Sequence, residues 1–255
     1  MMYNNIIQEY MQHFFISKNN IEGNMVRIGG TDFKHIKNVL RMKIGEEILI
    51  SDDDTASYIC EIIEFDDTEV VAKIVPKEAI DRELPVEIWV FQGLPKSDKM
   101  ETIIQKSVEL GAFAIVPVVT NRTIVKINKD KEAKKTKRWQ TISESAAKQS
   151  MRNKIPKVYE PISFEEAIKI AADFDVRLIP YENEEGFEYT RKVLSNIKYN
   201  SKIAIFIGPE GGFEESEIIK AKSLDILPIT LGKRILRTET AALTLLSMLI
   251  YNLEN

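Results

Sequence analysis

The sequence predicts two domains of different class: a small, mostly antiparallel β-barrel at residues 11–76 and an α/β domain with a mainly parallel sheet at residues 86–255. Two observations lead to this prediction. Short apolar runs separated by turn-forming Gly and Asp fill residues 14–75, whereas strand-like and helix-like segments alternate from residue 86 onward. The polar, proline-flanked segment 77–85 lies between the two patterns and is expected to be a linker.

The first domain is expected to combine five short strands with one helical insert. The strands are read from the runs FFI, MVRI, EEILISD, SYICEIIEF and EVVAKIV. The insert TDFKHIKNVLRMKIG has Thr31 or Asp32 as its N-cap, and Gly45 follows its end. Its apolar face is expected to consist of Phe33, Ile36, Val39 and Leu40. The insert also carries four cations, which give an otherwise acidic domain one basic edge.

The second domain is expected to place its ligands at one edge of the sheet. Its strands are read from VEIWVFQG, AIVPVV, VRLIPYE, KIAIFIG and PITLG, with helical patterns between them. In sheets of this kind, ligands bind outside the carboxyl ends of the parallel strands. The chemistry is therefore sought in the loops that follow these runs.

Composition excludes several function classes. The longest apolar runs are too short or too interrupted to cross a bilayer, and the first residues lack the pattern of a secretory signal. The single cysteine, Cys60, excludes an internal disulfide and is expected to be a small buried residue. With only two histidines besides, no metal site is expected. The sequence predicts a cytoplasmic protein with no membrane partner.

Charge is segregated along the chain. The net charge is −4, yet residues 121–157 hold twelve Lys or Arg against three acidic residues, a local charge of +9. Such segregation is expected of a protein that meets a polyanion on one face. A solvated lysine-rich helix would give the same pattern.

The stretch IFIGPEGGFEESEI, residues 205–218, predicts a strand, a glycine-rich turn and a helix. The turn is not a P-loop, because no Lys-Ser/Thr follows its last glycine, and it lacks the G-x-G-x-x-G spacing of a dinucleotide fold. Glu210, Glu214 and Glu215 would oppose a phosphate there. A neutral or cationic nucleoside such as S-adenosylmethionine fits better, although a tight turn with exposed acids is the alternative.

Two further strand-end loops support a ligand site. In PITLGKRILRTETAAL, the residues Arg237, Glu239 and Thr240 cluster where the chain enters a helix capped by Thr238 or Thr240. Arg237 is suited to hold an anionic oxygen, and Glu239 to orient it or accept a proton. A helix cap with an adjacent ion pair is the alternative. In LIPYENEEG, another strand ends at Pro180, Tyr181 and Glu182. The three loops, all without a phosphate signature, predict a single site.

Four segments, in this order, carry a family resemblance: GLPKSDKMETIIQKSVELG, the basic helix ending AAKQSMRNKIP, IGPEGG and LGKRILRTETAAL. With them the chain resembles the 16S ribosomal RNA (uracil-N3)-methyltransferases of the SPOUT superfamily from about Phe14 to its end. The resemblance implies an N-terminal PUA-like RNA-binding β-barrel and a C-terminal SPOUT α/β domain with a deep trefoil knot. IGPEGG paired with LG-x-RILR-x-ETA is a specific combination, whereas either half alone is weak.

The resemblance implies that S-adenosylmethionine is the cofactor and lies bent among the three loops, held largely by backbone groups. Glycine suits such loops because the backbone can approach a ligand closely. The implied cofactor-binding residues are Pro180, Tyr181, Glu182, Ile207, Gly208, Pro209, Glu210, Gly211, Gly212, Leu231, Gly232, Ile235, Leu236, Thr240 and Ala241.

The resemblance also implies the reaction and the partners. The substrate is a uridine in the decoding region of 16S rRNA, in free RNA or in the small ribosomal subunit, and the enzyme is a homodimer. Arg237 is expected to stabilise the uracil N3 anion, with Glu239 as base or orienting partner. The last helix, through Ala242, Leu245, Leu246 and Leu249, is expected to form either part of the dimer contact or core. Expected phosphate contacts are Arg41, Lys96, Lys106, Arg122, Lys148 and Arg152.

The chain departs from the family pattern near its start. An Arg usually precedes the first aromatic pair, and here His13 stands before Phe14-Phe15, while residues 1–10 extend beyond the usual start. Two other functions stay open: ribose 2′-O-methylation by a protein of the same superfamily, against which the RILRTETA stretch speaks, and a non-catalytic rRNA-binding assembly factor.

Overall fold

The computed structural model describes residues 11–52, 56–124, 129–181 and 186–254, with only the backbone given for 129–131. The chain divides into two compact units, Met1–Glu83 with Met151–Lys154, and Leu84–Ser150 with Ile155–Asn255. This division differs from the sequence-based boundaries in two respects. Residues 77–83 of the expected linker 77–85 belong to the first unit, and a short segment far along the chain, Met151–Lys154, returns to that unit.

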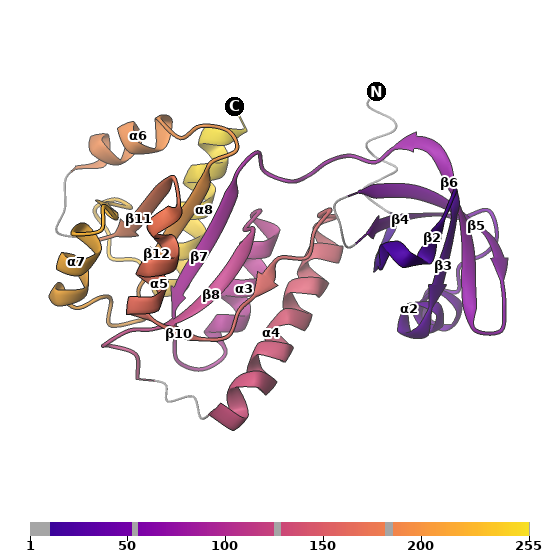
Figure 1. Ribbon diagram of the computed structural model, residues 1–255, viewed down its shortest axis with the longest axis horizontal. Helices are drawn as coiled ribbons and strands as arrows, with labels where there is room; N and C mark the ends of the chain where they lie inside the picture. The colour runs from indigo at the N-terminus through magenta and orange to yellow at the C-terminus, as the bar shows by residue number, and fades with distance from the viewer. Residues whose placement is uncertain (1–10, 53–55, 125–128, 182–185, 255) are drawn as a thin grey trace. The chain divides into compact units, whose positions relative to one another are not determined.

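The first unit is built on a six-stranded sheet among its described residues, in the order β1-β4-β5-β6-β3-β2 (Figure 1). Strand β1 pairs with β4 in parallel and every other neighbouring pair is antiparallel, which confirms the mostly antiparallel expectation. The strands are β1 (Gln12–Ile16), β2 (Ile21–Glu22), β3 (Met25–Gly29), β4 (Glu47–Asp52), β5 (Ser57–Phe65) and β6 (Glu69–Glu78), with a 3₁₀ turn at Lys18–Asn20.

The helical insert of this unit differs from its prediction in start and type. An α-helix, α2 (Gly30–Lys34), begins after Gly29 without a side-chain cap, so neither Thr31 nor Asp32 is its N-cap. A π-helix, η2 (His35–Leu40), continues it and ends at Arg41, whose φ is 54°. Phe33 and Ile36 pack into the core as expected, but Val39 is 66% exposed. The wider π-turn changes the spacing of side chains along the helix, so a 3.6-residue period misplaces Val39.

Two buried side chains of the first unit, His13 and Cys60, have structural roles. His13 is buried, and its Nε2 lies 2.8 Å from the hydroxyl oxygen of Ser51 on the neighbouring strand. Cys60 is fully buried in the first unit's core, and desolvation raises the pKa of its thiol to about 12. A thiol with that pKa is protonated at neutral pH, so Cys60 is a packing residue, as its surroundings in the sequence predicted.

The returning segment, Met151–Lys154, is fixed to the first unit by a buried ion pair. The Arg152 side chain is 3% exposed and pairs with the carboxylate of Glu83. Asn153 accepts a hydrogen bond from the Arg82 amide at 2.9 Å and donates one to the Ser57 hydroxyl at 2.7 Å. The prediction that Arg152 contacts RNA phosphate is therefore wrong, because its guanidinium is buried and already holds a carboxylate.

The second unit contains a parallel sheet, seven-stranded among the described residues, in the order β10-β8-β7-β12-β11-β13 with β9 beside β8. Its strands are β7 (Glu87–Gly93), β8 (Ala114–Val119), β9 (Lys157–Val158), β10 (Ile162–Ser163), β11 (Val176–Pro180), β12 (Lys202–Ile207) and β13 (Leu227–Ile229). Its helices are α3 (Lys99–Glu109), α4 (Lys129–Gln149), α5 (Phe164–Ile170, continued by a 3₁₀ turn at Ala171–Asp173), α6 (Phe187–Ser195), α7 (Glu215–Lys222) and α8 (Thr238–Leu253).

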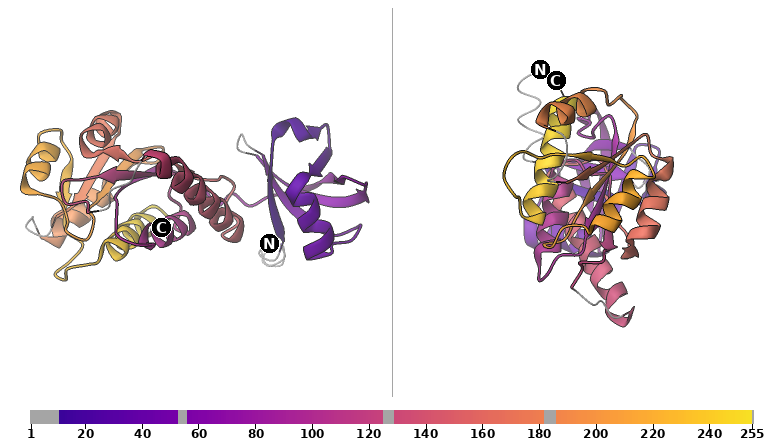
Figure 2. Two further views of the ribbon diagram at one scale, coloured as in Figure 1. Left: turned by 90° about the horizontal axis from the view of Figure 1, so that it is seen from below. Right: turned by 90° about the vertical axis from the view of Figure 1, so that its left-hand side faces the viewer.

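Helices cover both faces of this sheet: α3 and α8 lie on one face, and α5 and α7 on the other (Figures 1 and 2). On the α5 and α7 side, an aromatic core centres on Phe91 and Phe206, whose rings stack at 4.7 Å between centroids. On the other side, Ala242, Leu245, Leu246 and Leu249 of α8 are all fully buried. That face of α8 is core within one chain, so it is not available as a dimer contact.

In the part of the chain that the structure describes, no helix combines the length and the apolar character needed to span a bilayer. Over the same residues, the His, Cys, Asp and Glu side chains form no group of three placed to hold a metal ion.

Candidate cofactor and catalytic site

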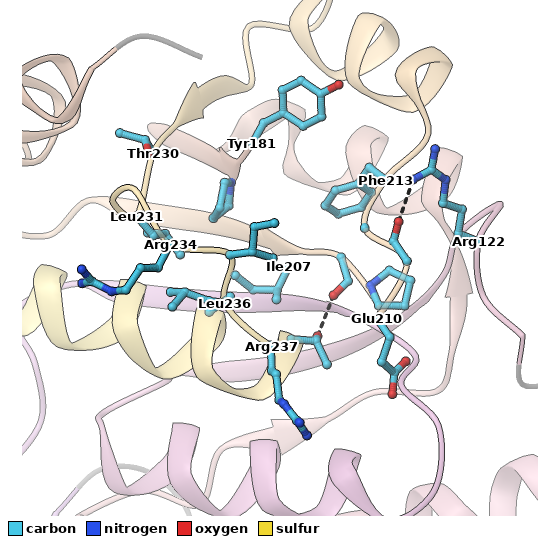
Figure 3. Close-up of a pocket in the computed structure, with 18 of the residues that line it drawn as sticks. Arg122, Tyr181, Ile207, Glu210, Phe213, Thr230, Leu231, Arg234, Leu236 and Arg237 are labelled. Carbon is cyan, nitrogen blue, oxygen red and sulfur yellow. Dashed lines mark hydrogen bonds between the residues drawn. The ribbon is translucent and has the colours of Figure 1, made fainter. Parts of the chain in front are cut away.

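A cavity of about 740 Å³ lies at the carboxyl ends of β11, β12 and β13. These strands run parallel, so the loops that follow them meet at one edge of the sheet, as their sequence predicted. Figure 3 shows the segments after β12 and β13 facing each other across the cavity, with Tyr181 after β11 closing a third side.

Most of the predicted cofactor-binding residues line this cavity. They are Pro180, Tyr181, Ile207, Gly208, Pro209, Glu210, Gly211, Gly212, Leu231, Gly232, Ile235, Leu236 and Ala241. Thr240 is exposed on α8 and is not among the lining residues, and Glu182 lies outside the described residues. Further lining residues were not among the predicted cofactor contacts, among them Lys99, Phe213, Glu215, Thr230, Arg234 and Thr238. Most of these directly adjoin the predicted loops; Lys99 instead comes from the segment after β7.

The Gly208–Gly212 turn has its shape because two close backbone approaches and one positive φ require glycine. A Cβ on Gly208 would lie 3.0 Å from backbone atoms of Gly212, and Gly212 itself has a φ of +66°. A Cβ on Gly93, at the end of β7, would lie 2.6 Å from the Cδ atom of Pro209. A side chain at either Gly93 or Gly208 would push the turn out of place, so the glycines fix its backbone close to the sheet.

Thr238 joins three segments of the site beneath the cavity. Its hydroxyl donates to the Gly208 carbonyl at 2.6 Å, shown dashed in Figure 3, and accepts from the Gln92 side-chain amide at 2.8 Å. Both side chains are buried. The expectation that Thr238 or Thr240 caps α8 is wrong: Arg237 is the N-cap residue, without a side-chain cap bond, because the Thr238 hydroxyl is used to hold the turn instead.

The acidic residues around the turn are bound by neighbouring loops. Glu210 accepts the Lys96 backbone amide at 3.0 Å, and the Lys99 ammonium lies 3.2 Å from it. Glu214 and Glu217 form a reciprocal capping box at the start of α7. In the sequence, Glu210 and Glu214 were explained by the charge of a ligand. Their contacts give them a second role, which is to hold the turn and the start of α7 against neighbouring loops.

These contacts determine the ionisation of Glu210. Desolvation raises the pKa of its carboxyl, but hydrogen bonds from its own backbone amide and that of Lys96, together with the Lys99 ammonium, outweigh it. The net result is a pKa below the ordinary value, so Glu210 is ionised at neutral pH.

The two predicted catalytic residues differ in their surroundings. Arg237 is exposed and lines the cavity at the start of α8, and in Figure 3 its guanidinium extends toward α3. Glu239 does not line the cavity. Its Oε2 is buried, forms no hydrogen bond and lies 3.4 Å from the Lys99 ammonium. Lys99 thus lies between the carboxylates of Glu210 and Glu239, a three-residue cluster that the sequence reading did not anticipate.

The cations predicted to contact RNA fall into four groups. Arg41 and Lys96 are exposed. Lys106 and Lys148 are partly buried and pair with Glu109 and Glu144 of their own helices, at 2.8 and 2.9 Å. Arg122 is exposed but donates to the Gly211 carbonyl at 2.7 Å and lines the cavity. Arg152, as described above, is buried.

Comparison with known sequences identifies the family. The profile of a family described as "RNA methyltransferase domain" matches residues 82–250, and that of "RNA methyltransferase PUA domain" matches residues 28–75. The ribosomal RNA small subunit methyltransferase E of Bacillus subtilis is 37% identical over 250 residues, which is 96% of this chain and 98% of that protein. The chain belongs to this family of RNA methyltransferases.

Solved structures of methyltransferases agree with the assignment. The methyltransferase E from Neisseria gonorrhoeae, bound to S-adenosyl methionine, has a TM-score of 0.82 and 33% identity, covering 95% of this chain and 98% of that one. A methyltransferase from Legionella pneumophila in complex with the same cofactor has a TM-score of 0.81 and 32% identity, covering 94% and 97%. The PUA-like and α/β fold classes are thereby confirmed, and the trefoil knot stays a prediction.

Proposed function

We propose that this protein transfers a methyl group from S-adenosylmethionine to N3 of a specific uridine in the decoding region of 16S rRNA. The observation that carries the proposal is the cavity at the ends of β11, β12 and β13, walled by the glycine turn 208–212 and lacking a phosphate-binding loop. Membership in the RNA methyltransferase family gives that cavity its reaction class.

The cavity fits the cofactor in size and character. Its volume of about 740 Å³ is in the range of small-molecule sites, and glycines 208, 211, 212 and 232 leave backbone groups open to a nucleoside. Tyr181, Ile207, Leu231, Ile235 and Leu236 supply apolar walls for the adenine. When bound, the cofactor supplies an activated methyl group on a sulfonium. The methionine carboxylate needs a cation, and Arg234 and Arg237 stand at different sides of the cavity (Figure 3).

The acceptor needs help to lose a proton. Uracil N3 carries hydrogen at neutral pH, and the anion left after its removal spreads its charge onto O2 and O4. Arg237, exposed at the cavity, stabilises that anion. The N3 electron pair then forms the bond to the methyl carbon, and the carbon–sulfur bond breaks with its electrons passing to sulfur. Glu239 acts as the base that takes the N3 proton, or as the partner that orients the acceptor site while the proton passes to solvent water. Its pairing with Lys99 favours the orienting role.

The RNA contacts and the assembly state belong to the same proposal. We assign phosphate contacts to Arg41, Lys96, Lys106 and Lys148, which are exposed or partly exposed. We place the enzyme in the cytoplasm, where its rRNA substrate is found, and propose that it acts as a homodimer. The exposed Tyr251, beside a shallow hollow lined by Leu110 and Ile250, marks a surface of α8 outside the core face. Sedimentation of wild-type protein and of Tyr251→Asp would test dimerisation through that surface.

The decisive experiment is a methylation assay with labelled S-adenosylmethionine and small ribosomal subunits from cells that lack this protein. Mass spectrometry then identifies the methylated nucleoside. We expect 3-methyluridine, reduced at least about hundredfold in Arg237→Ala because a donor to developing negative charge is lost. Arg191→Ala, an exposed arginine on α6, is the matched control and should keep full activity.

Other outcomes would redirect the proposal. A methyl group on ribose 2′-oxygen would keep the cofactor site and overturn the uracil acceptor. Cofactor binding without transfer to any RNA would favour a non-catalytic assembly factor.

A further inference from the structure

The loop after β8 makes two hydrogen bonds to the start of α7. The Asn121 backbone amide donates to Oε1 of Glu217 at 3.0 Å, and its side-chain amide donates to Oε2 of Glu214 at 2.9 Å. Glu217 is buried, and its other oxygen accepts the Glu214 amide at 2.8 Å. One residue of the β8 loop therefore binds both carboxylates of the α7 capping box.

Arg122, the next residue, holds the turn itself. Its Nη1 donates to the Gly211 carbonyl at 2.7 Å, the bond drawn dashed in Figure 3. Its aliphatic chain lies over the same glycine, because a Cβ on Gly211 would lie 3.3 Å from the Arg122 Cβ and 3.4 Å from its Cδ. Arg122 also lines the cavity. The exposed Arg122 side chain therefore directs its guanidinium toward the turn.

The turn receives a matching restraint on its other side. There, Glu210 is held by the Lys96 amide and by Lys99, both in the segment after β7. The glycine turn is thus fixed between the loops that follow two neighbouring strands, β7 and β8. A turn with glycines at 208, 211 and 212 has many conformations open to it, so its backbone groups need such restraints to be held ready for a ligand.

We propose that Asn121 and Arg122 form a clamp that positions the 208–212 turn for the methyl donor, with Arg122 acting as a positioning residue for cofactor binding and not as an RNA phosphate contact. The proposal rests on the proposed function, in which this cavity takes S-adenosylmethionine. It assigns Arg122 a use that its place in the basic segment 121–157 does not suggest.

A clamp and a phosphate contact affect different affinities. Loss of the clamp weakens cofactor binding even when no RNA is present, and in turnover it raises KM for the cofactor while KM for RNA stays unchanged. Loss of a phosphate contact does the reverse, because it leaves the cavity intact and removes a charge from the RNA footprint.

The test is calorimetric titration of S-adenosylhomocysteine, the stable product, into RNA-free full-length protein. We expect Arg122→Ala to weaken binding about fivefold, which corresponds to about 1 kcal/mol. Arg122→Lys, which can still donate to the Gly211 carbonyl, should recover part of the loss. Asn121→Ala should weaken binding in the same direction. Arg138→Ala is the matched control, because that arginine is exposed on α4, pairs with Glu101 at 2.8 Å and does not line the cavity.

The outcomes separate the clamp from the function it rests on. If Arg122→Ala and Asn121→Ala both bind the ligand as tightly as wild type, the clamp is wrong and the proposed function stands. If wild-type protein binds no S-adenosylhomocysteine, the proposed function fails and the clamp fails with it. Circular dichroism of each variant confirms that it is folded, and Arg122→Lys supplies the comparison if Arg122→Ala is not.

Discussion

Thr238 shows how a single buried hydroxyl can organise a site. It donates to Gly208 and accepts from Gln92, so it ties the end of β7, the glycine turn and the start of α8 together. Removing such a hydroxyl leaves two buried polar groups each without a hydrogen bond. Its contribution to stability is therefore large.

We predict that Thr238→Val weakens S-adenosylhomocysteine binding about tenfold and destabilises the fold by about 1 to 3 kcal/mol. Valine keeps the shape, but it leaves the Gly208 carbonyl without that donor and removes one acceptor of the Gln92 amide, both buried polar groups. Thr238→Ser, which keeps the hydroxyl, is the control and should remain close to wild type. Equal affinities for the valine and serine variants, measured by calorimetry, would contradict the prediction.

Glu210 makes the turn sensitive to acid. Its folded-state pKa is lowered, so the carboxylate's contribution is fully present above the ordinary glutamate pKa of about 4.3 and is lost as pH falls through the lower folded value. Ligand affinity in the wild type should therefore stay level from pH 8 to about 5, as far as Glu210 is concerned.

We predict that in Lys99→Gln the acid-induced loss of ligand affinity begins at a higher pH than in the wild type. The ammonium of Lys99 is one of the groups that lower the Glu210 pKa, so its removal makes the Glu210 carboxylate easier to protonate. Calorimetric titrations between pH 4 and 8 measure the affinity of each protein as a function of pH. The midpoint pH of the affinity loss is compared between variant and wild type. The absolute affinity is not compared, because Lys99 itself lines the cavity. Superimposable pH profiles would show that Lys99 does not control this ionisation.

At the residue scale, the sequence predicted which backbone segments form the site but not what their side chains do. The glycines of IGPEGG and all residues of LGKRIL except Lys233 lie at the cavity, and they could be placed there because strand ends and turn formers are local patterns. The partners of Arg122, Thr238 and Arg152 lie 30 to 146 positions away along the chain. Such pairings depend on the packed fold, which no local pattern specifies.

At the scale of elements, the alternation of strands and helices predicted the second unit well, whereas the returning segment 151–154 was missed. Basic residues at the end of α4 suggest an RNA-facing surface until Arg152 is found buried against Glu83. Charge alone does not separate the two cases, because a buried arginine and an exposed one look alike in sequence. The strand order is equally invisible, since neighbours such as β7 and β12, or β11 and β13, are not consecutive in the chain.

We predict that Glu83→Gln lowers the free energy of unfolding by about 3 kcal/mol. The substitution leaves the Arg152 guanidinium 3% exposed beside a neutral amide, and removing one member of a buried pair costs far more than breaking an exposed one. Glu165→Gln is the control: its pair with Lys220 involves side chains 64% and 44% exposed, so its loss should leave the free energy of unfolding close to that of the wild type. Urea denaturation followed by circular dichroism measures both. Equal losses would show that the Glu83 pair is not a structural tie.

At the scale of the whole molecule, the two units have separate cores. One cluster gathers residues of β1, β3 to β6 and the helical insert, and another gathers residues of the parallel sheet with α5 and α7. Every described residue that lines the cavity belongs to the second unit. A ligand bound there stabilises the loops that it contacts. Protection against local opening should therefore increase in those loops more than in the rest of the chain.

We predict that saturating S-adenosylhomocysteine slows amide hydrogen exchange in peptides covering residues 207–213 and 230–237, and leaves the strands β3 to β6 unchanged. At a free ligand concentration a hundred times Kd, binding stabilises the liganded state by about 2.7 kcal/mol. Amides that exchange only when the loops are open and unliganded should then exchange roughly a hundredfold more slowly. Thr238→Val at the same ligand concentration should show a smaller slowing in the same peptides, because its affinity is lower. Mass spectrometry of the full-length protein with and without ligand measures both. Equal slowing in β3 to β6 would mean that the first unit is energetically coupled to the cavity, and it would replace the present assignment of cofactor binding to the second unit alone.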